Sequence, residues 1–351
     1  MKRFFLIILF FLAIINPFLA QKRAWDSTYY RKYTDRLIIS VFQSYRNYSM
    51  DISQKLVKDT LGFSKVGYVA EANLITGFEI NYDKFNISFG YKSTTPKSKE
   101  QKGDTKYKNL ALNIGGNRWI IENSYRSYQG FYNKNTGNYD TTFKRTGIYD
   151  QNPTLKSEAY KTKFLFFTNS NKFSFKSGYS CSYRQLKSAF SFVLSANLYY
   201  NRLNSDSSFI PYPVRNYYDT HNSINGLNVF AFSIYGGGSF NLVLWKAFFI
   251  NLTLIIGPEQ QWRTYRHLSN YPTQDLFYSS ISGDFRGSMG LNFKKFFVLV
   301  SSSSDFSWYN GNSMEYLSKY GAINFSIGYR FHMKPPKFYQ KFQQSKIYKK
   351  F

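Results

Sequence analysis

A stretch near the end of the chain alternates apolar and small polar residues strictly. In the stretch INFSIGYRF the apolar positions are Ile323, Phe325, Ile327, Tyr329 and Phe331, and between them stand Asn324, Ser326, Gly328 and Arg330. Successive side chains of an extended strand point to opposite faces. The pattern therefore predicts a strand with one apolar and one polar face.

The same period of two recurs along most of the chain, and helical spacing is nearly absent. The runs span residues 36–53, 67–81, 84–92, 107–116, 118–132, 156–169, 171–185, 188–203, 227–244, 246–262, 276–293, 295–308 and 320–332. They are longer than the 5 or 6 residues that are usual in soluble domains, and they suit tilted strands that cross a membrane. The chain is predicted to be all-β.

Short and long connections alternate between these runs. Tight turns are predicted near residues 82–83, 116–117, 169–171, 186–187, 245–246 and 294–295, and long polar stretches at 54–66, 93–106, 133–155, 204–226, 263–275 and 309–319. Short turns at one rim and long loops at the other are typical of outer-membrane barrels. The sequence thus predicts a transmembrane antiparallel up-and-down β-barrel.

The number of strands is left open by the pattern. There are thirteen runs, but a single-chain barrel with both ends on one side of the membrane needs an even number. Either a further strand lies within 138–148, or one of the three runs between 156 and 203 does not cross the membrane. We predict 12 to 14 strands and favour 14.

The N-terminus is typical of a secretory signal. Lys2 and Arg3 precede an apolar stretch at 4–15, and Ala20 suits cleavage before Gln21. The apolar stretch is shorter than the 20 or so residues of a membrane-spanning helix. The predicted division is a signal peptide at 1–20, a periplasmic segment at 21–35, the barrel at 36–332 and a basic, flexible tail at 333–351.

The composition agrees with a membrane barrel and reduces the number of plausible classes of binding partner. Aromatic residues make up 21% of the chain, with 36 Phe and 32 Tyr, although mean hydropathy is only -0.42. Such rings suit membrane interfaces and β-faces. The net charge of +26 favours anionic lipid headgroups over nucleic acid, because no recognition-helix or RNA-binding pattern is present. One cysteine, Cys181, allows no internal disulfide, and no spacing of Cys, His and carboxylates predicts a metal or another cofactor.

Two faces of the predicted strands carry candidate functional residues. The apolar face of the last strand, Ile323, Phe325, Ile327, Tyr329 and Phe331, is predicted to contact lipid. The candidate lumen-lining residues are Glu71, Glu79, Arg118, Glu122, Arg126, Lys176 and Arg330. Charged groups inside a barrel can select solutes by charge, or they can pair with one another and fill the lumen. The sequence alone leaves both possibilities open.

An enzymatic function has little support in the sequence. His267 and Ser269 are two residues apart, a spacing that would place both on one face of a strand and let the histidine activate the hydroxyl. The surrounding residues are typical of a loop, however, and no acid completes a triad. We predict no catalytic residue and no enzyme; the alternatives are a hydrolase of outer-membrane lipid or a soluble exported β-protein.

Several short motifs resemble those of a known family. In chain order they are DSTYY from Asp26, YTDRL from Tyr33, YKNL from Tyr107, YQGFY from Tyr128, FSF from Phe173, QLKSA from Gln185 and GYRF from Gly328. Together they resemble an uncharacterised outer-membrane family of Bacteroidota that is catalogued as a domain of unknown function. This chain has Phe190 where the family pattern has a glycine.

The resemblance implies a β-barrel in the outer membrane and no assigned activity. The expected partners are outer-membrane lipid and lipopolysaccharide, together with the barrel-assembly machinery. The aromatic end of the last strand, at Tyr329 and Phe331, is similar to the C-terminal signals that this machinery recognises. The predicted role is a pore or solute channel, or an envelope-structural barrel.

Overall fold

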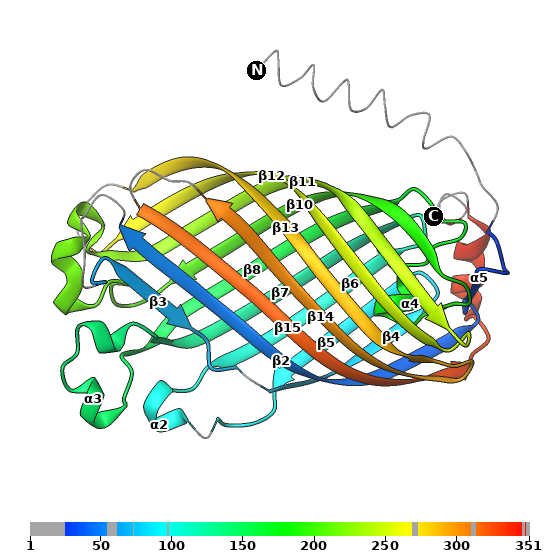
Figure 1. Ribbon diagram of the computed structural model, residues 1–351, viewed down its shortest axis with the longest axis horizontal. Coiled ribbons are helices and arrows are strands. Elements are labelled where there is room, and N and C mark those ends of the chain that lie inside the picture. The colour runs from blue at the N-terminus through cyan, green and yellow to red at the C-terminus, as the bar shows by residue number, and fades with distance from the viewer. Residues whose placement is uncertain are drawn as a thin grey trace, which may run out of the picture.

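Figure 1 shows a computed structural model in which long, tilted strands wrap around a common axis. The structure describes residues 25–345 and 348, apart from 55–61, 73, 97, 269–272 and 310–313. Among these residues, twelve antiparallel strands form a closed ring, because the last of them pairs with the first from His332↔Arg36 to Met314↔Gln54. Closure leaves the ring without a free edge.

The order of strands around the ring follows the chain. The ring contains β2 (Arg36–Gln54), β4 (Ile75–Tyr82), β5 (Phe85–Lys92), β6 (Lys106–Gly115), β7 (Trp119–Asn133), β8 (Gln151–Phe167), β10 (Ala189–Asn204), β11 (Ile224–Leu244), β12 (Phe248–His267), β13 (Gln274–Asn292), β14 (Phe296–Tyr309) and β15 (Met314–His332). The predicted up-and-down β-barrel is confirmed, with twelve strands rather than the favoured 14.

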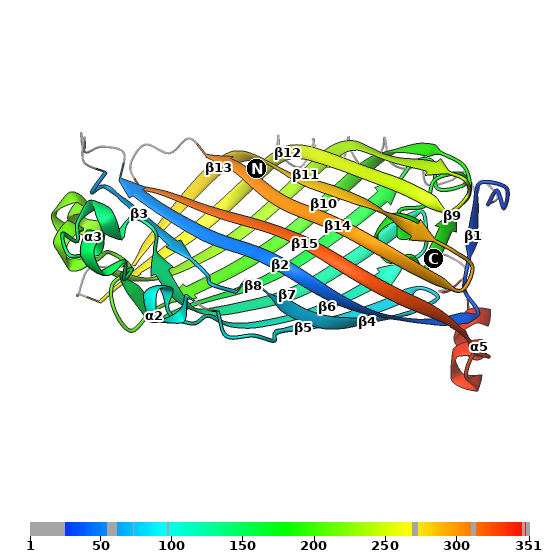
Figure 2. The same ribbon diagram turned by 60° about the horizontal axis from the view of Figure 1, so that its bottom comes forward.

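One short strand changes the width of the barrel along its axis. β3 (Lys65–Val69) pairs with the last part of β2 on one side and with the end of β7 on the other. It thereby takes the place of β4, β5 and β6, which reach only part of the way (Figure 2). The ring contains twelve strands at one end and ten at the other. The predicted run 67–81 is accordingly two strands, β3 and β4, with a break between them.

The two ends of the barrel differ in their connections. Short turns join β4 to β5, β11 to β12 and β13 to β14 at what we call the turn end. The opposite, loop end carries the long connections, which contain α2 (Lys99–Lys102), η1 (Thr136–Asn138), α3 (Phe143–Thr146), η2 (Tyr212–Tyr217) and η3 (Asp219–His221). The stretch 138–148, considered above as a possible strand, belongs to these loops.

The run at 171–185 is not a membrane-crossing strand, and this corrects the strand count. Its residues fold into the turn end of the barrel and form the short helix α4 (Lys176–Tyr179) and the strand β9 (Tyr183–Gln185). β9 pairs only with β1 (Tyr30–Lys32) from the N-terminal segment. Phe173 and Phe175 are buried, and so are the alternating Ser174 and Ser182, so the alternation of this run does not separate a lipid face from a lumen face.

The barrel wall is apolar outside and polar inside. The five apolar residues of β15 point outward and are 42% to 55% exposed, whereas Arg330 between two of them is 1% exposed. Other strands carry outward rings and branched chains in the same way: Val41, Phe78, Ile87, Leu110, Phe192, Leu254 and Phe285. This arrangement is the one expected of a barrel surrounded by lipid.

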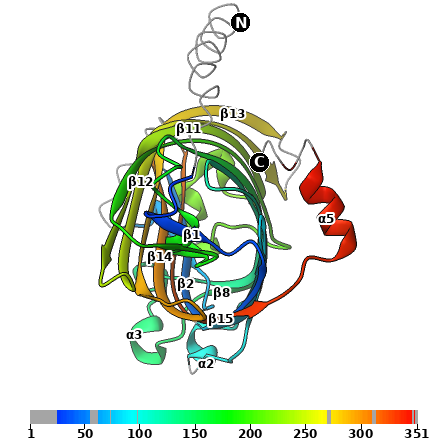
Figure 3. The same cartoon turned by 90° about the vertical axis from the view of Figure 1, so that its right-hand side faces the viewer.

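The helices of the described residues are short. None of them is both long and apolar enough to span a membrane. The longest is α5 (Lys337–Gln344), which lies outside the wall at the turn end (Figure 3). The tail predicted to be a flexible extension therefore contains a packed helix.

Candidate functional site

The turn end of the barrel is filled by residues 168–188, which we call the plug. Phe173 and Phe175 are almost fully buried and pack in one cluster with inward side chains of the wall, including Leu165 and Val193. The rings of Phe167 and Phe175 lie 5.0 Å apart. Looking along the axis from this end, β1 crosses the opening and joins the plug as the partner of β9 (Figure 3).

Polar contacts fix the plug to several strands. The Ser288 hydroxyl on β13 donates to the Gly178 carbonyl at 2.6 Å, and the Asn241 amide on β11 donates to the Ser174 carbonyl at 2.9 Å. A Cβ added at Gly178 would lie 2.8 Å from Cβ of Asn251, so only glycine fits at this contact. These bonds give buried carbonyls of the plug hydrogen-bond partners on the wall.

Lys176 and Arg330, both predicted lumen residues, turn out to be plug contacts. The Lys176 ammonium donates to the carbonyls of Gly115 at 2.6 Å and Asp83 at 3.2 Å. The Arg330 guanidinium donates to the Cys181 carbonyl and, at 2.6 Å, to Asn292 Oδ1. Both cations thus connect the plug region to the rim of the wall.

Burial changes the chemistry of two plug side chains. It lowers the pKa of Lys176 to about 8, since an ammonium is costly to bury. It raises the pKa of the Cys181 thiol to about 12, because burial disfavours the thiolate. Cys181 has no exposed surface and is therefore an unreactive thiol.

The loop end is filled by residues 205–223, which we call the mouth loop. Phe209, Ile210, Val214 and Tyr218 of this loop are at most 1% exposed, and they pack against inward side chains of the surrounding strands. Tyr68 on β3 donates its hydroxyl hydrogen to the Phe209 carbonyl at 2.7 Å. The loop end is thus closed by an apolar core, in contrast to the polar middle of the barrel.

A polar chamber lies between the plug and the mouth loop. Its main cavity has a volume of about 290 Å³, and a smaller one of about 80 Å³ adjoins it through shared residues. Serines and asparagines line much of the main cavity: Asn86, Ser88, Asn109, Asn113, Ser301, Ser302, Ser303 and Asn324. Charged side chains reach into it from β7, β8, β13 and β14.

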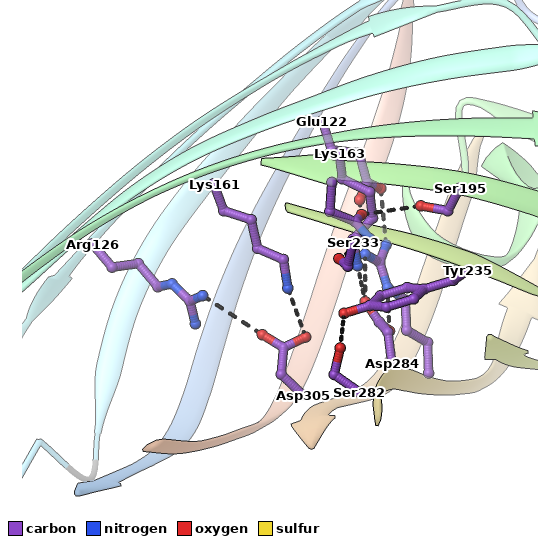
Figure 4. A network of polar contacts seen from close by, with 12 residues as sticks. Glu122, Arg126, Lys161, Lys163, Ser195, Ser233, Tyr235, Ser282, Asp284 and Asp305 are labelled. Atoms are coloured by element: carbon purple, nitrogen blue, oxygen red, sulfur yellow. Dashed lines mark hydrogen bonds and ion pairs between the residues drawn. The ribbon is translucent and has the colours of Figure 1, made fainter. Parts of the chain in front are cut away.

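Ion pairs cross this chamber from wall to wall (Figure 4). Glu122 on β7 accepts two hydrogen bonds from Arg286 on β13, at 2.8 and 2.7 Å. Lys163 on β8 pairs with Asp284 on β13, and Arg286 Nε also donates to Asp284 at 3.1 Å. Since β7 and β13 are five strands apart in a ring of twelve, these side chains span the lumen.

A second group of ion pairs lies beside the first. Asp305 on β14 pairs with Lys161 on β8 at 2.9 Å and with Arg126 on β7 at 3.7 Å. The Arg126 guanidinium also lies 3.8 Å from the ring centre of Tyr320. Together the two groups contain three carboxylates and four cations, so the charges largely neutralise one another across the lumen. We call them the cross-lumen network.

The sequence matches one protein family over most of its length. The model of a domain of unknown function, DUF4421, matches residues 24–331. The chain belongs to this family. The predicted resemblance to an uncharacterised family is thereby confirmed, while the assignment to Bacteroidota stays a prediction. No curated protein matches the DUF4421 chain.

Solved structures similar to the DUF4421 chain are outer-membrane barrels of low identity. The outer-membrane protease OmpT from Escherichia coli is 9% identical, with 85% of this chain and 97% of that one covered and a TM-score of 0.37. The β domain of the Bordetella autotransporter BrkA is 9% identical, with coverages of 83% and 99% and a TM-score of 0.35. The translocator domain of NalP from Neisseria meningitidis is 7% identical, with coverages of 84% and 88% and a TM-score of 0.34.

The DUF4421 barrel places the predicted lumen residues in different surroundings. Glu122 and Arg126 belong to the cross-lumen network, and Glu79 lines the same cavity, where it accepts hydrogen bonds from Asn81 and Asn86. Glu71 lies near the loop end and is bonded to the loop that contains α2, through Ser98 at 2.9 Å.

Arg118 is not among the residues that line either cavity. It precedes β7 in the turn, and its guanidinium lies 5.5 Å from the ring centre of Phe166. Arg118 is four residues before Glu122, so alternation would place both side chains in the lumen only if the strand continued through the turn.

Other members of the network could have been found from the pattern of the sequence. Asp284 and Arg286 flank Phe285, which is 40% exposed, and Lys161 and Lys163 stand in phase with the inward Leu165. Charged residues at the inward positions of a strand are the signal. Which carboxylate meets which cation depends on the ring closure, which no single strand reveals.

Two of the histidines lie together at the loop end. His267 ends β12, and its ring is stacked on that of His221 in the mouth loop, with centres 6.0 Å apart. Ser269 lies outside the described residues. Within the described part of the chain, no group of three or more His, Cys, Asp or Glu side chains is arranged to hold a metal ion.

Proposed function

We propose that this DUF4421 protein is an exported outer-membrane barrel that is closed at rest and serves as a structural component of the envelope, not as an open pore. The observation that carries this proposal is the plug, which packs an apolar cluster inside the turn end. The mouth loop and the cross-lumen network support it, because each places protein groups across a different level of the lumen.

The membrane location rests on the wall itself. Large apolar side chains are exposed on the outside of most of the long strands. A closed antiparallel ring also satisfies its backbone hydrogen bonds internally, as a structure surrounded by lipid must. The signal-like N-terminus supports export. With the short turns and both ends of the barrel at the periplasmic side, the long loops face outward, toward lipopolysaccharide.

The proposal can be tested in planar bilayers. Detergent-purified protein, shown to be folded by its heat-modifiable gel mobility, should give no discrete conductance steps. A double deletion that replaces residues 172–186 and 206–222 with short Gly-Ser linkers should conduct, because it removes both end closures. Reproducible, ion-selective steps from the unaltered protein would overturn the proposal and make the chamber a solute path.

Each single deletion provides a control within this experiment. Removal of the plug alone leaves the apolar mouth loop in place, and removal of the mouth loop alone leaves the plug. We expect both single variants to stay silent or nearly silent. If the double deletion is folded and also silent, the cross-lumen network alone closes the barrel, which contradicts the role assigned to the plug.

A further inference from the structure

The tail helix α5 lies against the outer surface of the barrel wall at the turn end (Figure 3). Its Tyr339 is 6% exposed, with ring centres 5.1 Å from Tyr82 and 6.2 Å from Phe85. Tyr82 on β4 is in phase with the outward Ile80, and Phe85 on β5 is in phase with the outward Ile87. The helix therefore packs on the same face of the wall that lipid covers.

The turn between β4 and β5 holds the tail in this position. Asp83 accepts hydrogen bonds from the hydroxyls of Tyr339 at 2.8 Å and Tyr348 at 2.5 Å. The Lys84 ammonium lies 3.4 Å from the ring centre of Tyr348 and donates to the Tyr348 carbonyl at 2.7 Å. Both sides of one hairpin turn are thus used to attach residues from the very end of the chain.

The height of α5 along the wall places it at the edge of the apolar band. Ile80 and Ile87 are 40% and 48% exposed and stand two residues from Tyr82 and Phe85 respectively. Two residues of a strand correspond to about 7 Å, and strand tilt reduces the height along the membrane normal further. A helix at this level lies among lipid headgroups rather than in the aqueous space.

The free face of α5 has the chemistry of a membrane-surface helix. Lys337, Lys341 and Gln344 are exposed and recur at helical spacing, and Phe338 beside them is 74% exposed. Residues 333–351 contain six lysines and no aspartate or glutamate. An exposed ring next to a row of lysines fits a surface that offers acyl chains and phosphates side by side.

We propose that α5 binds the headgroups of anionic phospholipids in the leaflet at the turn end through Lys337 and Lys341, with Phe338 inserted between the acyl chains. This inference rests on the proposed function, because it requires that lipid surround the barrel. The contacts with outward rings favour lipid over a soluble polyanion, since a soluble partner would meet the open rim and not the wall beside the apolar band.

The test uses the full-length protein in lipid vesicles and a fluorescent probe. A Phe338→Cys variant is labelled with the fluorophore NBD, and the unaltered protein controls for Cys181, which is buried. Vesicles consist of phosphatidylcholine alone or of phosphatidylcholine with phosphatidylglycerol. The measurement is the rate at which dithionite, an aqueous reductant, destroys the label. Because dithionite does not cross a bilayer, and because α5 and the mouth loop lie at opposite ends of the barrel, it is supplied to both sides of the membrane.

We expect the label at position 338 to react at least about threefold more slowly in the vesicles with phosphatidylglycerol, because anionic lipid draws the helix into the interface. Lys337→Gln combined with Lys341→Gln should remove most of this difference. Lys144→Gln with Arg145→Gln, two exposed residues of α3 at the loop end, removes the same charge elsewhere and should preserve it. Equal rates in both vesicle types would overturn the inference.

Two further labels separate a failure of this inference from a failure of the membrane placement. A label at Phe325→Cys, on the lipid face of β15, should be protected from dithionite in both vesicle types. A label at Tyr212→Cys, in the mouth loop and 82% exposed, should react fast. If position 325 is protected and position 338 reacts as fast as position 212, the tail inference alone fails. If position 325 also reacts fast, the membrane placement fails with it.

Discussion

Glu122 and Arg286 face one another across the barrel and are joined by two hydrogen bonds of 2.8 and 2.7 Å. They come from β7 and β13, strands on nearly opposite sides of the ring. Because the bonds run through the lumen and not along the wall, this pair acts as a strut between two sides of the barrel. Asp284 and Lys163 extend it toward β8.

Loss of one partner of this strut should destabilise the barrel. We expect Arg286→Met to lower the free energy of unfolding by about 3 kcal/mol, since it leaves two carboxylates in a largely buried site with one cation fewer. Urea unfolding in detergent micelles would measure this. Adding Glu122→Gln should restore part of the loss, because the pair is coupled.

A more exposed pair on β8 provides the control for this prediction. Lys156 and Glu158 are 2.8 Å apart, with side chains 38% and 21% exposed. Lys156→Gln should cost less than about 1 kcal/mol, because solvent screens such pairs. If Arg286→Met costs no more than Lys156→Gln, the cross-lumen network does not brace the wall.

The plug should make stability depend on pH through Lys176. Its pKa is about 8 in the folded protein and higher in the unfolded chain, so between these values the unfolded chain binds more protons. The contribution of Lys176 to stability should therefore rise as the pH rises from about 8 toward 10.5, and be constant below that window. Denaturant midpoints of the unaltered protein and of Lys176→Met, measured from pH 7 to 10.5, isolate this contribution. Parallel profiles for the two proteins would show that Lys176 is not buried as described.

The fit of Gly178 should control access to Cys181. A side chain at position 178 would collide with Asn251, so Gly178→Val should displace the plug and expose the buried thiol. We expect labelling by a maleimide to be at least about tenfold faster in the variant than in the unaltered protein under native conditions. Gly236→Val is the matched control, since a Cβ at Gly236 meets no atom within 4 Å. Equal labelling rates in both variants would mean that the plug does not depend on this contact.

A charged residue on the outward face of β15 should destabilise the barrel in a membrane. Ile327→Arg is expected to lower the free energy of unfolding from vesicles by about 2 kcal/mol or more, because a guanidinium would enter the hydrocarbon region. Tyr212→Arg, at an exposed position of the mouth loop, should be close to neutral. Unfolding titrations in phosphatidylcholine vesicles measure both changes. A tolerated arginine at position 327 would place this face outside the lipid.

The sequence predicted the wall well because the wall repeats one rule. On β15 and on β2 each outward residue faces the same environment, so alternation reports directly on the two sides. The plug breaks this rule, since protein surrounds it on all sides and both Phe173 and Ser174 are buried. Its alternation is therefore the same as that of a membrane strand, and the pattern alone did not show which of the three runs between 156 and 203 fails to cross the membrane.

Only some members of the cross-lumen network were predicted from the sequence, for a related reason. Alternation placed Glu122 and Arg126 inside, but the partners of these residues lie more than 160 positions further along the chain. Their meeting depends on the number of strands and on the stagger of the ring, which are properties of the closed barrel. Lys176 and Arg330 were predicted as candidate lumen-lining residues, and the alternation did not indicate that they donate to backbone carbonyls at the plug.

The short strand β3 limits the diameter of the barrel at the loop end, and a change of side chains does not alter this limit. Barrel diameter grows roughly in proportion to strand number, so ten strands enclose a circle about one-sixth narrower than twelve. The barrel is thus narrower at the loop end than at the turn end, and main-chain hydrogen bonds between the strands hold the narrower end at its width. A variant that lacks the plug and the mouth loop would therefore still have this narrow end. The largest solute that could pass through such a variant would be limited by the number of strands in the fold.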